Sequence, residues 1–497
     1  MVNILDCTFR DGGYYNNWDF NEEEISNYIK HISKLPIEYI EIGYISNIDK
    51  GYYGKLYFID RKIINQFKEA NKKIAVMVDI KNFNDDLKSK ILDIIDHVDL
   101  FRFAINYNDL ESSLDLIKSL GIAKRKIALN FMYLSEWYSD HLVIEEIKKI
   151  NFAEYIYLVD SYGSCFPDDI SKAINSLKQK SIYKLGFHAH NNLELAFANS
   201  LCAINEDIDI IDSTLQGMGR GAGNLKTENI LAYYAIKEKK SIDIQSVGDL
   251  TTVFDSLKNE FNWGSNFSYA LAGLLSYPQS KVMDMLTTRF LSLKSVISKI
   301  LMKDKEEPFF YELFDEKLIP SNQNKILFIG GGESVFKHRN AINTWIKKNN
   351  PFILFISTKH SNLINFQSKK SIFSIHGQEL SRLDNESISN ANFFVSPESN
   401  RLETNIEFLD PSKISTLNKN SKLFYGSILE ASIKLVINSG FGSIHFVGFD
   451  GYDYNSIKHK ISIENSNIFD IYKADLKIIS LTPTKYNSLI KKSIYGG

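Results

Sequence analysis

The chain has 497 residues, which is too long for one ordinary domain and predicts two or three. Its hydrophobic share of 44% and charged share of 24% are typical of a globular protein in water. Because 60 acidic residues nearly balance 58 basic ones, the composition does not favour a nucleic-acid or membrane partner.

Residues 2 to about 235 repeat one pattern, in which a short apolar run precedes a segment of helical period. The predicted strands are Asn3–Asp6, Tyr39–Gly43, Ile74–Asp79, Leu100–Ala104, Ile127–Phe131, Tyr155–Asp160, Lys184–His188 and Ile208–Ser213. Amphipathic segments such as Glu22–Leu35 and Asp168–Lys178 lie between them. Strands that alternate with helices form parallel sheets, and eight such units have the size of a closed barrel. We therefore predict an α/β fold with an N-terminal (β/α)8 TIM barrel over residues 1–237; an open doubly wound sheet is the alternative.

A change of pattern after the barrel predicts three further regions. Residues 238–305 predict an all-helical extension packed on the barrel, with helices at Val247–Asn259, Phe267–Leu275 and Val282–Met302. Residues 306–323 are charged and contain two prolines, which is typical of a linker. Residues 324–497 predict a smaller Rossmann-like α/β domain. Its predicted strands are Ile326–Ile329, Phe352–Ile356, Ala391–Val395, Leu423–Tyr425, Ile444–Val447 and Ile478–Leu481.

Metal-ligand side chains follow three strands that the barrel would make neighbours. His188 and His190 end strand seven with both rings on one face, Asp11 follows strand one, and Asn224 follows strand eight. Because the last strand of a barrel closes against the first, we expect these side chains to meet at its C-terminal face. Two imidazoles, a carboxylate and an amide oxygen suit Mn²⁺ or Mg²⁺, with Zn²⁺ as a further option, and leave positions open for substrate.

The residues beside these ligands suggest what the metal site does. Arg10 precedes Asp11, and a guanidinium beside a metal can stabilise an enolate oxygen as its charge develops. Gly12 and Gly13 are expected to let the backbone turn tightly in a loop and to admit substrate. Gly217, Gly219, Gly221 and Gly223 are expected to do the same after strand eight. Arg220, which lies among them, is a candidate substrate-binding residue.

Three motifs carry a resemblance to a known family: residues 5–13 (LDCTFRDGG), residues 186–192 (GFHAHNN), and residues 212–224. They resemble the metal-dependent lyase and aldolase barrels related to hydroxymethylglutaryl-CoA lyase, which include 2-isopropylmalate synthase and homocitrate synthase. Within that group the chain is most similar to the 4-hydroxy-2-oxovalerate aldolases. Residues 159–163 and 195–200 support the resemblance, which covers about residues 1–235.

The resemblance implies a carbon–carbon lyase that takes a 2-keto acid and an aldehyde. It implies that Asp11, His188 and His190 bind a divalent metal, with Asn224 as a fourth ligand or close to it. It also implies that Arg10 stabilises a pyruvate-type enolate.

One position departs from the aldolase pattern. These aldolases place a catalytic histidine three residues after the aspartate of the motif, and this chain has Tyr14 there. The group that moves the hydroxyl proton is then Tyr14, Tyr15, or a tyrosine of the helical extension such as Tyr269. Glu41 and Asp160, at the ends of strands two and six, are candidates for lining the substrate pocket or for structural hydrogen bonds in the barrel mouth.

The C-terminal domain offers a weaker signal. Gly330, Gly331, Gly332 and Ser334 lie at a strand-to-helix junction, where backbone N–H groups can hold a phosphate. Asp450 follows another strand, at the edge where open sheets bind ligands. This region resembles the Rossmann-like domains of pterin pyrophosphokinase-like and surface-glycan-modifying proteins, which implies a nucleotide or sugar-phosphate ligand. The alternative is a domain without a ligand role that the sequence reveals.

Two alternatives to the aldolase interpretation remain at this point. One is an acetyl-CoA-dependent Claisen synthase, which would use the same metal site. The other is a non-catalytic, metal-stabilised scaffold for the C-terminal domain, which would not need a cation at Arg10. The three cysteines, Cys7, Cys165 and Cys202, lack metal-ligand spacing and indicate a cytoplasmic protein with reduced thiols. No signal peptide or membrane span is expected, and we expect a homo-oligomer.

Overall fold

The structure is a computed structural model that describes most of the chain. The described residues are 1–48, 52–178, 182–288, 293–301, 314–315, 319, 325–367, 370–375, 379–383, 393–397, 414–417, 427–454, 456 and 458–496. Their contacts divide the chain into two compact units, Met1–Met283 and Asp284–Gly497, which are treated separately below.

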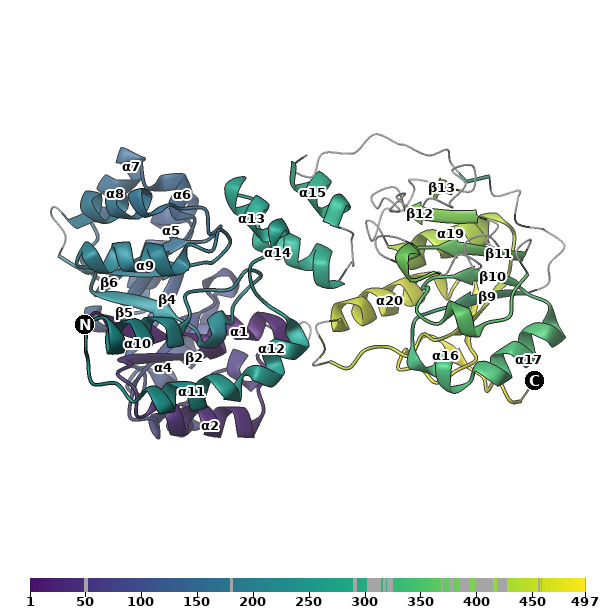
Figure 1. Cartoon of the computed structure of the whole chain (residues 1–497), viewed down its shortest axis with the longest axis horizontal. Coiled ribbons are helices and arrows are strands. Elements are labelled where there is room, and N and C mark those ends of the chain that lie inside the picture. Colours follow the sequence, from purple (N-terminus) through teal and green to yellow (C-terminus); the bar gives the residue numbers. More distant parts are fainter. Residues whose placement is uncertain are drawn as a thin grey trace. The chain divides into compact units, whose positions relative to one another are not determined.

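The first unit contains a closed barrel of parallel strands, paired in sequence order from β1 to β8, with β8 paired back to β1 (Figure 1). The strands are β1 (Asn3–Asp6), β2 (Tyr39–Ile45), β3 (Lys73–Val78), β4 (Leu100–Ile105), β5 (Ile127–Phe131), β6 (Tyr155–Asp160), β7 (Lys184–Ala189) and β8 (Ile210–Ser213). The predicted barrel is therefore confirmed, and the alternative of an open sheet is wrong. Each predicted strand overlaps an observed one, with ends that differ by two residues at most.

Helices surround the barrel, and some begin with a capping side chain. They are α2 (Glu22–Ile32), α3 (Arg61–Lys68), α4 (Asp85–Ile94), α5 (Leu110–Ser119), α6 (Leu134–Trp137), α7 (His141–Lys148), α8 (Pro167–Lys178), α9 (Ala196–Asn205) and α10 (Thr227–Ile236). For example, the Asn21 side chain accepts from the backbone of Glu24 at 2.8 Å, while the Glu24 carboxylate accepts from the backbone of Asn21 at 2.9 Å. This reciprocal cap satisfies two N–H groups that a helix start otherwise leaves without partners.

The helical segments after the barrel are shorter than predicted. They are α11 (Ile244–Val253), α12 (Asp255–Phe261), α13 (Phe267–Leu274), α14 (Gln279–Met283) and α15 (Leu293–Leu301). The predicted helix Val247–Asn259 is interrupted at Phe254, and Val282–Met302 is divided by a π-helical turn at Asp284–Thr288. Helix α11 packs against α2, as expected of an extension of the barrel.

The second unit is built around an open parallel sheet in the order β13-β12-β11-β10-β9-β14-β15-β16. Its strands are β9 (Ile326–Ile329), β10 (Phe352–Phe355), β11 (Ser371–Ser374), β12 (Phe393–Pro397), β13 (Ile414–Leu417), β14 (Ser443–Val447), β15 (Lys477–Ser480) and β16 (Ile490–Lys491). Its helices are α16 (Glu333–Lys337), α17 (Arg339–Asn349), α19 (Ile428–Asn438) and α20 (His459–Tyr472). The sheet confirms the predicted α/β domain. The strand order reverses direction between β9 and β14, which makes their carboxyl ends the switch point of the sheet.

Several predictions for this unit differ from the structure. Strands β11, β13 and β16 were not predicted, because each is short and lacks a long apolar run. The predicted strand Leu423–Tyr425 and most of the predicted linker lie outside the described residues. The contacts divide the chain after Met283, which groups α15 with the second unit, whereas the sequence places the end of the extension at residue 305. The predicted domain boundaries stay predictions.

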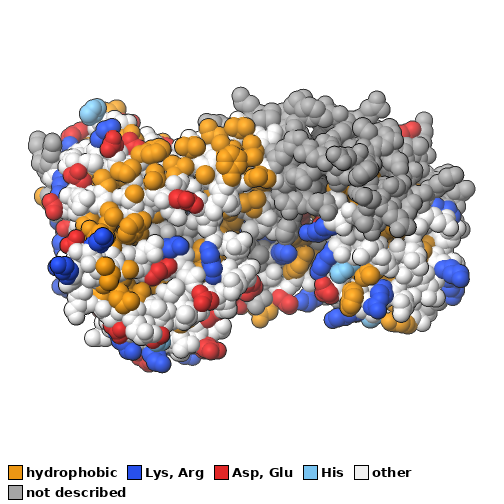
Figure 2. Space-filling model, viewed as in Figure 1, with side chains coloured by type: hydrophobic (Ala, Val, Ile, Leu, Met, Phe, Trp, Pro, Cys, Tyr) orange, Lys and Arg blue, Asp and Glu red, His pale blue; other side chains and the backbone are white. Residues whose placement is uncertain are grey.

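The surface of the barrel unit agrees with the balanced composition. On the face that Figure 2 shows, acidic and basic side chains are interspersed, with apolar side chains between them. No helix in the described part of the chain is both long and apolar enough to cross a bilayer.

Candidate active site

Arg10 and Asp11 lie in a helix, where the sequence predicts a loop. Helix α1 (Thr8–Asn16) starts directly after β1, and both residues are buried within it. The two glycines that follow keep ordinary backbone angles, so the expected tight turn is wrong. They are needed for packing instead, because a Cβ at Gly12 would lie 2.6 Å from Met218 Sδ and one at Gly13 would lie 2.2 Å from the Trp18 ring.

The two histidines at the end of β7 are each held through Nδ1. His188 Nδ1 donates to Asp212 Oδ2 at 2.8 Å, and His190 Nδ1 donates to the backbone oxygen of Asp160 at 2.8 Å. A hydrogen bond at Nδ1 fixes the tautomer and leaves the lone pair of Nε2 for a ligand. His188 Nε2 lies 3.3 Å from Asp11 Oδ2, and the two rings have centroids 4.9 Å apart.

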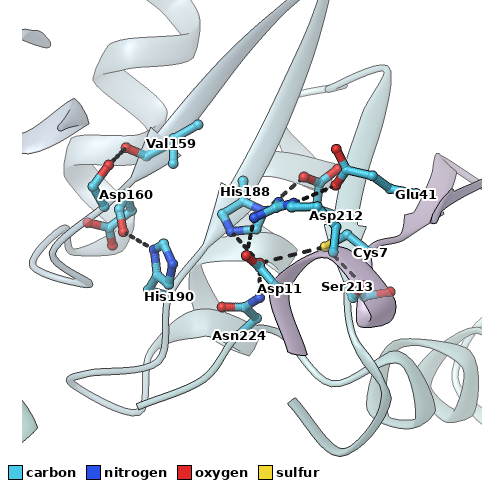
Figure 3. Close-up of polar contacts among 12 residues, drawn as sticks. Cys7, Asp11, Glu41, Val159, Asp160, His188, His190, Asp212, Ser213 and Asn224 are labelled. Carbon is cyan, nitrogen blue, oxygen red and sulfur yellow. Dashed lines mark hydrogen bonds and ion pairs between the residues drawn. The ribbon is translucent and has the colours of Figure 1, made fainter. Parts of the chain in front are cut away.

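Asn224 completes the predicted set from the loop after β8 (Figure 3). Its Nδ2 donates to Asp11 Oδ2 at 2.5 Å, and its backbone forms a bridge with His190. Its Oδ1 is buried without a hydrogen-bond partner among the described residues. The predicted turns in this loop are present at Gly217, Gly221 and Gly223, which all have positive φ.

A closed ring of ion pairs and hydrogen bonds holds Asp11 and His188. Two of its members, Arg102 and Asp212, were not predicted. Arg102 donates to Glu41 at 2.9 Å and to Asp212 at 2.5 Å. Arg10 Nε donates to the same Glu41 oxygen at 2.8 Å, and Arg10 Nη1 donates to Asp11. With the contacts of His188, the ring runs Arg10–Glu41–Arg102–Asp212–His188–Asp11 and back to Arg10.

Arg102 could have been suspected from the sequence, whereas the role of Glu41 could not. Arg102 lies in the otherwise apolar strand β4, is fully buried, and stacks over the Tyr157 ring at 4.3 Å. A cation on a barrel strand requires a buried anion, which is a readable signal. Glu41 was expected to line the substrate pocket or to bond structurally in the barrel mouth. Its contacts match the second role, because it is 1% exposed and bound to both arginines.

The surroundings of Asp11 and His190 shift the pKa of each group downward. Burial raises the pKa of Asp11, but Arg10 and the two histidines outweigh it and lower the pKa to about 2. Burial, together with the nearby His188, lowers the pKa of His190 to about 3. At neutral pH the carboxylate is therefore charged and the His190 ring is neutral.

A second grouping of ligand-type atoms lies below these residues. Atoms of Cys7, His188 and Asp212 are within 4.8 Å of one another. Two of these groups already bind each other, because Asp212 Oδ2 accepts from both Arg102 and His188 Nδ1. Burial also raises the pKa of the Cys7 thiol well above its usual range, which keeps it protonated. This grouping fits an orienting role beneath the site better than a metal site of its own.

Asp160 has a structural position rather than a place in the pocket wall. It is 1% exposed, and its carboxylate accepts from the backbone of Ser164 at 3.0 Å and of Cys165 at 3.3 Å. Burial raises its pKa to about 6. These contacts shape the turn after β6 and place the Asp160 carbonyl against His190, so of the two predicted roles the structural one fits.

The candidate tyrosines and Arg220 lie around the mouth of the same site. Tyr14 Oη lies 2.9 Å from Tyr44 Oη, and the Arg220 guanidinium stands 3.8 Å above the Tyr14 ring. Tyr15 donates to the backbone oxygen of Gly221 at 3.1 Å and is thereby engaged. Tyr269 is buried on α13, and a Cβ at Gly221 would lie 2.7 Å from its ring.

The predicted phosphate residues of the second unit also come together, but their polar groups are occupied. A cavity of about 660 Å³ at the ends of β9 and β14 is lined by Gly330–Gly332 and Asp450, among others. The Asp450 carboxylate accepts from the Ser334 backbone at 2.9 Å and from its hydroxyl. A Cβ at Gly332 would lie 2.5 Å from Asp450 Cγ. The carboxylate therefore stands where a phosphate was expected to bind the helix start.

Comparisons with known proteins agree with the barrel. A sequence model of the HMGL-like family matches residues 110–255. The 4-hydroxy-2-oxovalerate aldolase of Pelotomaculum thermopropionicum is 26% identical over 52% of this chain and 77% of its own length. The oxaloacetate decarboxylase of Mycobacterium tuberculosis is 24% identical over 54% of this chain and 79% of its own length.

A solved structure gives a higher identity over the same region. The N-terminal domain of a Bacteroides vulgatus protein described as an aldolase is 37% identical, with a TM-score of 0.54. The match covers 57% of this chain and 96% of that domain. These relatives place the barrel among enzymes of the carbon–carbon lyase class. Within that class, the chain belongs through its barrel to the HMGL-like family.

Proposed function

We propose that the barrel is a divalent-metal-dependent aldolase that makes or cleaves a carbon–carbon bond through a pyruvate-type enolate. The observation that carries the proposal is the convergence of Asp11, His188, His190 and Asn224 beside Arg10. The matches to an aldolase and to a decarboxylase of 2-oxo acids support it. A non-catalytic scaffold would not require Arg10, which is held by two carboxylates at considerable desolvation cost.

The donor set fits a divalent cation. The hydrogen bonds at Nδ1 of His188 and His190 leave both Nε2 atoms for a ligand, and the Asp11 carboxylate lies 3.3 Å from His188 Nε2. The buried Asn224 Oδ1 lacks a partner among the described residues. A buried amide oxygen without a partner is costly unless a cation or water completes it. When bound, such a cation would polarise the carbonyl of a 2-keto acid as a Lewis acid.

The chain's own residues would then handle charge and protons. Arg10 is fixed through Nε and Nη1, so its planar group is pre-oriented toward the oxygen on which negative charge develops. In cleavage, the 4-hydroxyl loses its proton, the C3–C4 bond breaks, and the electron pair stays on C3 as the enolate. Tyr14 is proposed as the group that moves the hydroxyl proton, with Tyr44 Oη as its hydrogen-bonded partner.

The experiment measures exchange of the methyl protons of pyruvate with solvent deuterium, followed by aldol turnover over a panel of aldehydes. We expect exchange with added Mn²⁺ and none after chelation. Release of free thiol from acetyl-CoA in the presence of a keto acid would instead support the Claisen synthase. Failure of the manganese-loaded protein to exchange pyruvate protons would overturn the proposal.

A variant separates the two proton transfers in this scheme. Tyr14→Phe should reduce aldol cleavage by about 10²-fold or more, the lower end for a general acid–base group. Exchange of pyruvate protons does not involve the hydroxyl of an aldol substrate, so it should be affected far less. Unchanged cleavage in Tyr14→Phe would move this role to Tyr269 or to water.

A further inference from the structure

Arg220 differs from the other arginines of the site in its partners. Arg10 and Arg102 each contact two carboxylates. Arg220 is half-buried, and within the described part of the chain no carboxylate lies within ion-pair distance of it and no hydrogen bond engages it. Its contact is the face of the Tyr14 ring, 3.8 Å from the guanidinium carbon.

A partly desolvated cation with no anion is an unusual arrangement in a folded protein. Removing a charge from water costs free energy unless an ion pair or hydrogen bonds compensate for the lost hydration. Stacking on an aromatic ring returns part of that energy through the face of the guanidinium. The N–H groups in its plane are left to donate, and a carboxylate or phosphate can accept two of them side by side.

The surroundings hold this arginine in one place. Gly219 and Gly221 flank it, and a Cβ at either would lie 2.7 Å from the Asn224 amide or the Tyr269 ring. Trp18 packs edge-on against Tyr14, with ring centroids 4.9 Å apart. The loop and the ring that support Arg220 are therefore both fixed by close packing, which pre-organises the cation for a ligand.

Arg220 lies close to the proposed enolate site. Its charge acts on Asp11, Arg10 and His190, which places it within electrostatic reach of all three. Tyr14, on which it stacks, follows Asp11 by three residues in α1, about one helical turn or roughly 5 Å. A group bound by Arg220 would then belong to the part of a substrate beyond its keto-acid end.

We infer that Arg220 selects substrates whose aldehyde portion carries an anionic group, a carboxylate or a phosphate, beyond the bond that is made or cleaved. This inference rests on the proposed aldolase function and names its substrate class. The anion would accept from the guanidinium edge while the keto-acid end lies beside Arg10. Arg220 makes and breaks no bond in the reaction; it binds the distal charge and positions the aldehyde carbon.

The first test measures binding, without turnover. Calorimetry on the manganese-loaded full chain compares 2-oxoadipate with 2-oxohexanoate, which have equal length but differ in the distal carboxylate. We expect the wild type to bind the diacid about 10- to 100-fold more tightly, the range for a hydrogen bond to a charged group. In Arg220→Met this ratio should fall to near one, and Arg220→Lys should keep part of it.

The second test measures turnover and distinguishes the two anions. Succinic semialdehyde is compared with butyraldehyde, and glycolaldehyde phosphate with glycolaldehyde, each with pyruvate. The aldehyde pair in which the anionic member is favoured more strongly over its neutral counterpart shows whether the site takes a carboxylate or a phosphate. Arg220→Met should abolish this preference for the anionic aldehyde. Arg125→Met, at an exposed arginine of the turn before β5, is the matched control for loss of one positive charge.

Three results would overturn the inference. One is a wild type that prefers no anionic ligand in either test. Another is an anionic preference that Arg220→Met and Arg220→Lys leave unchanged. The third is an equal loss of mono- and diacid binding, which would assign Arg220 to the keto-acid end. Failure of the proposed function is a separate result, because it appears as a wild type that does not exchange pyruvate protons.

Discussion

The sequence predicts ligand sites at the carboxyl ends of parallel strands in both units, yet the two edges differ in which polar groups they leave without a partner. In the barrel, the charged ring engages one oxygen each of Glu41 and Asp212, while the Asn224 oxygen has no partner among the described residues and the histidines are held only through Nδ1 and the contact of His188 with Asp11. In the open sheet, Asp450 already occupies the amide and hydroxyl of Ser334. Location at such an edge is therefore insufficient to indicate a ligand; unsatisfied groups that face one space are the better sign.

The largest effect should come from removing a ligand of the barrel site. His188→Ala or Asp11→Ala deletes one of four protein donors, so metal affinity should fall by more than the 10- to 100-fold typical of losing an outer partner. Metal content after dialysis and pyruvate exchange measure this. Asp450→Ala, at the edge of the other sheet, is the control and should retain the metal. Stoichiometric metal in both barrel variants would show that the metal lies elsewhere.

The charged ring can be broken at its deepest member. Arg102→Met leaves Glu41 and Asp212 buried without their shared cation, which should lower the free energy of unfolding by about 3–5 kcal/mol. Urea denaturation, followed by a spectroscopic signal of the barrel unit, measures this change in the free energy of unfolding. Arg61→Met removes an arginine whose partner Asp93 is exposed, and should cost less than about 1 kcal/mol. Equal costs for the two variants would mean that the ring does not stabilise the barrel.

Substitution of Arg10 shows whether the charged ring contributes to catalysis as well as to stability. Arg10→Ala should reduce pyruvate exchange by about 10²- to 10³-fold, the scale for one donor to a developing oxyanion. The metal should stay bound, because Arg10 supplies no lone pair. Exchange at the wild-type rate in a metal-loaded variant would remove Arg10 from the mechanism. Arg10→Lys shows how much of the effect requires a planar group held by Glu41.

The smallest effect is expected at the other sheet. Asp450→Ala removes the carboxylate that caps the Ser334 amide, which should lower the stability of the second unit by about 1 kcal/mol. Thermal unfolding of the full chain measures the change. The exposed Asp453, paired with Lys485, is the matched control, and Asp453→Ala should have less effect. A loss of pyruvate exchange in Asp450→Ala would contradict the separation of the two units' roles.

The sequence predicted the barrel because short apolar runs and helical periods are local patterns. Barrel closure then brings the strand ends that carry Asp11, His188, His190 and Asn224 together. It did not predict α1, since the pair Gly12–Gly13 is typical of a loop and its packing against Met218 and Trp18 is tertiary. The pairing of Arg102 with Asp212 joins strands β4 and β8 across the barrel, which no local pattern encodes.

Roles were harder to predict than positions. Glu41 and Asp160 were placed at the right strand ends, but only the observed partners show that both are engaged within the protein. In the second unit the sequence indicated both the glycine-rich turn and Asp450 as parts of a ligand site. It could not show that the Asp450 carboxylate would occupy the backbone N–H of Ser334, which was expected to bind a phosphate. Residue types indicate which contacts are possible, whereas the partners decide which groups remain for a ligand.

The contact between Asn224 and Asp11 spans 213 residues of chain. During synthesis, the first ligand emerges from the ribosome long before both histidines and the asparagine, so no partial barrel can hold the complete donor set. We expect high-affinity metal capture to coincide with closure of β8 onto β1. Metal uptake by nascent chains of increasing length would then report the moment at which the barrel closes, without any need to observe catalysis.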